Sequence, residues 1–321
     1  MILTVTINPL LERRFLFEKI SIGCENRGGK EKLSAGGKGI NVSRQLNCLN
    51  MDNVSLTFLG ATNGKILREI LIKERIKTVP IRVQNETREA IVVIDKSAGK
   101  VTTFFGSNSQ ISSDEVNEYL KKLEKMIENC EMVVFSGSSS CKETDIIFPF
   151  GIETANKYDK ISICDTYGSH LKDCIEKAPT IIHNNVSEIE KSLNISLNSE
   201  KEKIAFLNYL YSKGVKQSFL TNGELTAYAA NFDFLYEIEP PNVKNVYSTG
   251  SGDGFVAGIA YSLHNDLTFE EGLAFAASIG ALNAGRLEVC SIMINEIEKF
   301  KMSIRISPVG KKMKTLDVTP C

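Results

Sequence analysis

The sequence lacks the cysteine and histidine patterns of a zinc-binding or disulfide-linked protein. It has eight cysteines, none of them in a C-x-x-C pair, and only three histidines in 321 residues. Structural zinc sites and disulfide frameworks need such residues at close, regular spacings. We therefore expect the scattered cysteines to be reduced and mostly buried.

Neither a strong charge of one sign nor a long apolar run is present. The formal net charge is -1, so nothing indicates a nucleic-acid or anionic-membrane partner. No segment approaches the ~20 apolar residues that a membrane-spanning helix needs. The first residues, MILTVTINPLLERR, contain neither a basic leader nor the apolar run of a secretory signal. We therefore expect a cytoplasmic protein.

No linker rich in Pro, Gly or Ser divides the chain, and no internal repeat is visible. Short apolar runs such as ILTVTIN, EMVVFSG, KISICD and TIIHNN alternate with amphipathic segments. This alternation is typical of a mostly parallel sheet covered by helices. We therefore expect one α/β domain over residues 1–321.

One amphipathic segment carries a clear start signal. SSDEVNEYLKKLEKMIENC predicts a helix with a serine cap and an acidic first turn. The residues expected on its buried face are Val116, Tyr119, Leu120, Leu123, Met126 and Ile127.

Two regions, residues 10–34 and 79–105, interrupt the alternation and predict β hairpins. Strands inserted between α/β units usually leave the main sheet. We expect these to meet as a small β lid over the ends of the core strands. Their exposed edges would allow pairing between two copies, so a homodimer through the lid is a hypothesis.

The densest glycine cluster, TGSGDGFVAG at residues 249–258, precedes an apolar helical pattern. The backbone of Gly250, Ser251 and Gly252 would form a helix N-terminus, where unpaired N–H groups and the helix dipole favour a phosphate. A carboxylate in that place would repel a bound anion. The presence of Asp253 therefore favours a general base that acts while the helix amides stabilise a transferring phosphoryl group.

Two other interpretations of this cluster remain open. In the first, the segment is a glycine-rich turn whose aspartate complements the helix dipole. In the second, GDGFVA matches the G-x-G-x-x-A dinucleotide fingerprint and indicates an oxidoreductase, although that fingerprint usually follows a core strand early in the chain. The phosphate loop G-x-x-x-x-G-K-[ST] is absent from the sequence.

A second glycine cluster, SAGGKGINVSRQL, also begins a helical pattern. Gly36, Gly37 and Gly39 permit a close approach to the backbone, while Lys38 adds a positive charge and Asn41 can donate and accept hydrogen bonds. One cluster carries a lysine and the other an aspartate. Together they indicate two substrates that meet head to head.

Both clusters, with TINPLLE, ETREAIVVI, FSGS, NNVSEIE and LTNG, resemble the ribokinase-like (PfkB) carbohydrate kinases. Within that family the sequence is most similar to the branch of 1-phosphofructokinases and tagatose-6-phosphate kinases. The resemblance covers nearly the whole chain and implies a three-layer ribokinase-like α/β fold with a β lid. It also implies Mg²⁺-dependent transfer of the γ-phosphoryl group of ATP to fructose 1-phosphate or tagatose 6-phosphate, with fructose 6-phosphate as a third acceptor.

The resemblance implies a role for each matching residue. The catalytic set is Asp253 as base, with Gly250, Ser251 and Gly252 as the anion hole. The nucleotide set is Asn185, Thr221, Gly223, Gly252 and Asn283, and the magnesium set, acting through water, is Asn185 and Glu188. The phosphosugar set is Glu12, Arg27, Gly37, Lys38, Asn41, Arg88 and Ser138.

Some of these roles compete with simpler interpretations. Without the resemblance, Asn185 and Glu188 equally predict a capped surface helix, and an exposed arginine is more often solvated than functional. With it, Arg88 is expected to grip the phosphate already on the sugar, because a bidentate guanidinium suits a phosphate monoester. Arg27 has a similar expected role.

The sequence departs from the family pattern at several places. Glu12 replaces the usual aspartate that holds sugar hydroxyls, and GSSSCKE replaces a proline-containing loop. Asn184 and Ser251 replace the usual proline and alanine. No catalytic group is lost, but the acceptor stays open, and a catalytically weak sugar-phosphate or nucleotide sensor on the same fold is the alternative.

Overall fold

The computed structural model of the protein describes residues 1–241 and 243–309. Its larger sheet has ten strands in the order β14-β13-β12-β11-β10-β9-β8-β1-β4-β5. The strands from β5 to β11 are parallel, and β12, β13 and β14 extend the sheet antiparallel. Their bounds are β1 Ile2–Thr6, β4 Asn53–Gly60, β5 Thr78–Val83, β8 Met132–Ser138, β9 Ile161–Tyr167, β10 Ile181–Asn185, β11 Gln217–Asn222, β12 Leu225–Asn231, β13 Phe234–Glu239 and β14 Arg305–Val309.

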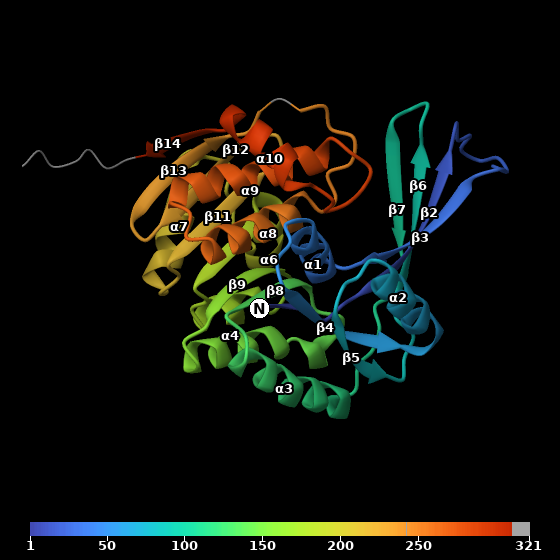
Figure 1. Cartoon of the computed structure of the whole chain (residues 1–321), viewed down its shortest axis with the longest axis horizontal. Helices are drawn as coiled ribbons and strands as arrows, with labels where there is room; N and C mark the ends of the chain where they lie inside the picture. Colours follow the sequence, from blue (N-terminus) through green and yellow to red (C-terminus); the bar gives the residue numbers. More distant parts are fainter. Residues whose placement is uncertain (242, 310–321) are drawn as a thin grey trace, which may run out of the picture.

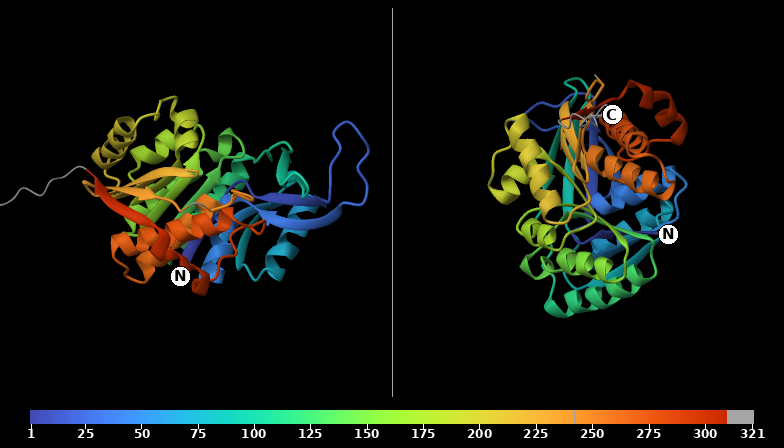
Figure 2. Two further views of the ribbon diagram at one scale, coloured as in Figure 1. Left: turned by 90° about the horizontal axis from the view of Figure 1, so that it is seen from above. Right: turned by 90° about the vertical axis from the view of Figure 1, so that its left-hand side faces the viewer.

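Helices cover both faces of this sheet and produce three layers (Figures 1 and 2). Each face of the sheet has its own hydrophobic core, as two neighbouring residues of β1 show. Leu3 packs on the face covered by α3–α7, whereas Ile2 packs on the face covered by α1, α8 and α9. The helix bounds are α1 Lys38–Cys48, α2 Ala61–Lys73, α3 Ser113–Glu128, α4 Ile147–Lys157, α5 Leu171–Glu176, α6 Val186–Leu193, α7 Glu200–Ser212, α8 Ser251–His264, α9 Phe269–Ala284 and α10 Ile294–Phe300. The expected α/β class, a mostly parallel sheet between helices, is confirmed.

The helix predicted from SSDEVNEYLKK is confirmed as α3. Ser112 caps it: its hydroxyl accepts a hydrogen bond from the Glu115 N–H at 3.4 Å, and the Glu115 carboxylate accepts one from the Ser112 N–H at 2.8 Å. The reciprocal pair satisfies two amides that a bare helix end would leave unpaired. On the buried face, Leu120 and Met126 are only half-buried, while the other four predicted residues are fully buried.

The smaller sheet, which we call the lid, has the strand order β3-β2-β6-β7. Its strands are β2 Leu10–Phe17, β3 Lys30–Gly36, β6 Glu89–Asp95 and β7 Lys100–Phe105. It stands apart from the main sheet, and the β2–β3 loop projects furthest from the core (Figures 1 and 2). The expected lid is therefore present, built from both predicted regions.

The expectation that residues 79–105 all belong to the lid is wrong at its first strand. β5 pairs in parallel with β4 and forms an edge of the main sheet. Ile81 and Val83 on this strand are buried in the same core as Phe58. Burial of these alternating apolar side chains against α3 favours the main sheet over the thinner lid.

No helix in the described part of the chain is long and apolar enough to cross a membrane. The seven cysteines in that part are all free. Cys130, Cys164, Cys174 and Cys290 are buried, whereas Cys24 is exposed on the lid loop. The eighth, Cys321, lies outside the described residues, as does the rest of 310–321.

Candidate active site

A cleft of about 680 Å³ lies where the carboxyl ends of β10 and β11 meet the N-termini of α1, α6 and α8 and the lid. In open parallel sheets this end is where ligands bind. Most predicted site residues line it: Glu12, Gly37, Lys38, Asn41, Arg88, Asn185, Glu188, Thr221, Gly223, Gly250, Ser251, Gly252 and Asp253. Segments far apart in the sequence thus contribute to one site.

The glycine cluster at 249–258 forms the start of α8, as predicted. Gly250 has a φ of +83°, and a Cβ there would lie 2.3 Å from Val289, so only glycine fits the turn. The N–H of Ser251 donates to the Ser248 carbonyl at 3.1 Å. Since this turn engages the Ser251 amide, any anion hole must rely mainly on amides further into the first turn, from Gly252 onward.

Asp253 is buried in this first turn, with 4% of its surface exposed. Its Oδ2 accepts a hydrogen bond from the side-chain amide of Asn41 at 2.7 Å. Burial raises its pKa to about 7, against the opposing effect of Lys38 and with a further rise from the charge of Asp165. A carboxylate that titrates near neutrality suits a general base.

Lys38 lies at the start of α1 and faces three carboxylates. Its Nζ is 2.9 Å from Glu188 Oε1 and 3.3 Å from Asp165 Oδ1, and Asp253 is a third negative influence. Burial opposes the lysine charge, but the three acids outweigh it and hold its pKa above the usual value. Lys38 is therefore a fixed cation at the centre of the site.

Asn185 and Glu188 form the capping box of α6. The Asn185 Oδ1 accepts a hydrogen bond from the Glu188 N–H at 2.8 Å, and Glu188 Oε2 accepts one from the Asn185 N–H at 3.3 Å. The capped-helix interpretation is therefore correct, and both residues also line the cleft. The cap leaves the other Glu188 oxygen directed at Lys38.

The cleft fits a divalent cation held partly by its substrates. Three carboxylates around one lysine leave an excess of negative charge. No three His, Cys, Asp or Glu side chains converge as a complete ligand set among residues 1–241 and 243–309. Mg²⁺ is typically bound by one or two carboxylates, water and substrate phosphates. Glu188 and Asn185 would hold it in this way.

Arg88 lies on the lid side of the cleft and makes no ion pair among the described residues. Its guanidinium donates to Asn108 Oδ1 at 3.0 Å and to the Asn8 carbonyl at 3.2 Å, while its Nε has no protein partner in that part of the chain. Partial burial lowers its pKa. A desolvated cation without a counter-ion is suited to bind an anion.

Glu12 has a partner that the sequence did not reveal. Its Oε2 accepts two hydrogen bonds from Arg14, at 2.9 and 2.7 Å, and the same arginine donates to the Leu287 carbonyl at 3.2 Å. Arg14 thus compensates the negative charge of Glu12 and holds its carboxylate in place between the lid and the core. One oxygen remains for a ligand.

Three predicted residues do not line the cleft. Arg27 is on the β2–β3 loop, where its exposed guanidinium pairs with Glu25. Ser138 accepts a hydrogen bond from Asn8 at 3.4 Å. Asn283 donates to the Thr249 carbonyl at 2.9 Å and accepts from the Cys290 N–H at 2.7 Å.

Asn283, expected in the nucleotide set, is buried outside the cleft, and its amide is bonded within the protein. Instead it braces the loop that leads into α8. Smaller residues of the same helix line the cleft at this end: Ala277, Gly280, Ala281 and Ala284.

Sequence reasoning missed Asp165, Tyr167 and His183. Asp165 and His183 are buried side chains at the carboxyl ends of β9 and β10. A sequence pattern could have predicted these residues, because KISICD and TIIHNN are apolar runs that each end in polar residues. Neither residue belongs to a glycine cluster, so nothing local marked them as part of the site.

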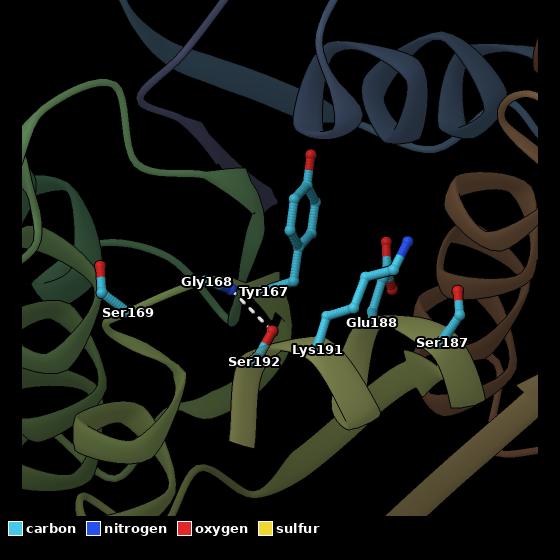
Figure 3. A pocket seen from close by; sticks show the side chains of 7 residues that line it. All are labelled: Tyr167, Gly168, Ser169, Ser187, Glu188, Lys191 and Ser192. Carbon is cyan, nitrogen blue, oxygen red and sulfur yellow. Dashed lines mark hydrogen bonds between the residues drawn. The ribbon is translucent and has the colours of Figure 1, made fainter. Parts of the chain in front are cut away.

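A second pocket of about 430 Å³ adjoins the cleft across Tyr167, Ser187 and Glu188. Its other lining residues are Gly168, Ser169, Lys191 and Ser192. Figure 3 shows Glu188, Lys191 and Ser192 projecting from α6 toward this space, with Ser192 accepting a hydrogen bond from the Gly168 N–H at 2.9 Å. The cleft therefore continues past Glu188 over the first turns of α6.

Within the described residues, a buried carboxylate at a helix N-terminus, a fixed lysine and an arginine without an ion pair lie together on a mostly parallel α/β core with a separate lid. This combination indicates a phosphotransferase for small molecules. Residues 13–295 match the model of the pfkB family carbohydrate kinases. The chain belongs to this family. G-x-G-x-x-A does not follow a core strand here, because β13 ends at Glu239 and α8 begins at Ser251, so the oxidoreductase interpretation is wrong.

Known relatives agree in length and fold. Tagatose-6-phosphate kinase of Staphylococcus epidermidis is 28% identical over 312 residues, covering 96% of this chain and 100% of the relative. 1-Phosphofructokinase of Borreliella burgdorferi is 26% identical over 310 residues, covering 96% and 99%. A Thermotoga maritima structure named "Possible 1-phosphofructokinase" has a TM-score of 0.88 at 25% identity, covering 96% and 99%.

Proposed function

We propose that this carbohydrate kinase transfers the γ-phosphoryl group of ATP to a hydroxyl of a ketohexose monophosphate, either fructose 1-phosphate or tagatose 6-phosphate. The observation that carries the proposal is one cleft that holds Asp253 and Lys38 together with the guanidinium of Arg88, which has no ion-pair partner in the described part of the chain. The first two suit phosphoryl transfer, and the third suits an acceptor that already bears a phosphate. The names of the two curated relatives support the same pair of acceptors.

In this mechanism Asp253 takes the proton of the attacking hydroxyl, and the Asn41 amide fixes the direction of its carboxylate. Such a base contributes about 10²–10⁴-fold to the rate. Lys38 and the amides at the start of α8 stabilise the charge of the transferring group. Bound Mg²⁺ would neutralise the nucleotide phosphates near Glu188 and Asn185.

Arg88 would hold the phosphate already on the sugar through its free N–H groups. Glu12 would accept from sugar hydroxyls with its remaining oxygen. On the opposite side, Thr221 and Gly223 would border the nucleotide, beside the small residues of α9. The two substrates would then meet over Lys38.

The test is coupled ADP release with ATP and Mg²⁺ across fructose 1-phosphate, tagatose 6-phosphate, fructose 6-phosphate, fructose and ribose. We expect turnover on one phosphosugar and little on fructose or ribose. Arg88→Met should raise the KM for the phosphosugar by about 100-fold, through loss of a charged hydrogen-bonding partner. Arg27→Met is the matched control, because Arg27 is exposed outside the cleft, and its KM should stay within about twofold.

Turnover only on unphosphorylated sugars would contradict the proposed acceptor. Binding of ATP and a phosphosugar without turnover on any sugar would favour the sensor instead. In that case, Glu12 and the GSSSCKE loop are the residues to examine.

We also propose that two copies associate through the lid. Ile91 and Phe104 are paired across β6 and β7, with exposed fractions of 39% and 59%. An exposed apolar pair on a thin sheet is typical of an interface. Sedimentation at micromolar concentration should show a dimer that Phe104→Glu dissociates, and a wild-type monomer would contradict the proposal.

A further inference from the structure

Asp165 is a fully buried carboxylate that the proposed chemistry does not use. It lies near the carboxyl end of β9, with 0% of its surface exposed. Three side chains donate to it: the hydroxyl of Ser136 at 2.7 Å, Nζ of Lys38 at 3.3 Å and Nδ1 of His183 at 3.0 Å. These donors hold its pKa below the ordinary range, although burial alone would raise it.

A charge buried this deeply is a poor source of stability. The unfavourable free energy of its desolvation is only about offset by good partners. A pair of apolar residues would fill the same space without that cost. The arrangement is better explained by what Asp165 holds in place, since two of its donors, Lys38 and His183, also line the cleft.

His183 extends the contact toward the nucleotide side. Its Nδ1–H donates to Asp165, and its Nε2 lies 3.3 Å from the hydroxyl of Thr221. The ring stacks on Phe255 at a centroid distance of 5.1 Å. A Cβ on Gly252 would lie 3.1 Å from its Cε1, so the ring also supports the first turn of α8.

These contacts form one continuous path below the cleft, from Lys38 through Asp165 and His183 to Thr221. The path joins the start of α1 to the ends of β9, β10 and β11. Lys38, His183 and Thr221 line the cleft, whereas Asp165 does not and is fully buried. A displacement of either buried residue would therefore reach both substrates.

We propose that Asp165 and His183 are positioning residues for phosphoryl transfer: Asp165 fixes Lys38 beside the transferring group, and His183 fixes Thr221 at the nucleotide. Asp165 does not line the cleft, and His183 lines it with only 2% of its surface exposed. The proposal rests on the proposed kinase function. It adds two residues from the ends of neighbouring strands to the groups that the glycine clusters supply.

The first test is a double-mutant cycle on kcat with Asp165→Asn and Lys38→Met. Asparagine keeps the size of Asp165 but removes its charge, and its amide nitrogen cannot replace the carboxylate oxygen as a hydrogen-bond acceptor. Asp165→Asn should lower kcat by about 100-fold, with both KM values within about threefold. In the Lys38→Met background, Asp165→Asn should lower kcat by less than about twofold, because the effects of residues that act as one network are not additive.

The second test separates His183 from Asp165. His183→Phe keeps the stack on Phe255 but loses both hydrogen bonds. It should raise the KM for ATP about tenfold and lower kcat less than Asp165→Asn does. Thr221→Val should reproduce this effect, and the double variant should add less than about twofold.

A structural control lies on the same strand as Asp165. Ser162 is also fully buried, but its hydroxyl bonds to the backbone of Thr180, away from the cleft. Ser162→Ala should lower the melting temperature while kcat stays within twofold. Independent effects of Asp165 and Lys38 on kcat, or an Asp165→Asn enzyme with wild-type kcat, would overturn the proposal.

A wild type that transfers no phosphoryl group would remove the proposed function but not this inference. The same variants are then compared by calorimetric titration with ATP. Non-additive losses of affinity for Lys38 and Asp165 would support the path. Additive losses would overturn it, and no ATP binding at all would overturn both proposals.

Discussion

The end of β9 and the start of α8 each bury one aspartate beside the same lysine, yet the two carboxylates differ. Asp165 has three donors and a lowered pKa. Asp253 has one side-chain donor, Asn41, and a pKa raised to about 7. Opposite pKa shifts of two neighbouring acids indicate different roles. Asp165 holds the charge of Lys38 in place, whereas Asp253 can exchange a proton.

The largest effect should come from removing the acid at α8. Asp253→Asn keeps the shape of the side chain and abolishes its basicity, so kcat should fall by at least about 10²-fold. ATP affinity, measured by calorimetry, should change little. A variant with more than a tenth of the wild-type rate would contradict the assignment of the base.

The raised pKa of Asp253 also predicts how stability depends on pH. Because the folded protein binds this proton more tightly than the unfolded chain, stability is lost as the pH rises from about 4 to about 7. The expected loss is on the order of a few kcal/mol. Urea unfolding at several pH values should show a smaller decline in Asp253→Asn than in the wild type, and equal declines would count against the burial of a protonated acid.

The smallest expected effect is a shift in the pH dependence of kcat/KM, caused by the influence of Asp165 on Asp253. Wild-type kcat/KM should rise with pH through about 7, as Asp253 loses its proton. The charge of Asp165 contributes to that raised pKa, so Asp165→Asn should move the acid limb to lower pH by about one unit. The pH–rate profiles of both proteins measure this directly, and a limb that moves upward would show that the acids do not interact as the structure indicates.

Local patterns account for most of what could be predicted. The serine cap of α3 and the glycine turn before α8 depend on groups within a few residues of one another, so the chain itself displays them. The two interruptions of the α/β alternation predicted the lid, and the resemblance to a family placed most of the cleft residues. The resemblance also placed Asn283 at the nucleotide, whereas in the structure it lies outside the cleft and bonds to Thr249 and Cys290.

The sequence by itself determined the α/β alternation, the two glycine clusters and the family. Only the tertiary structure decided that β5 joins the main sheet, that Arg14 neutralises Glu12 and that Asp165 lies beside Lys38. The physical reason is the distance along the chain over which each interaction acts. Capping and periodicity act between neighbours along the chain, whereas burial and charge compensation depend on residues that only folding brings together.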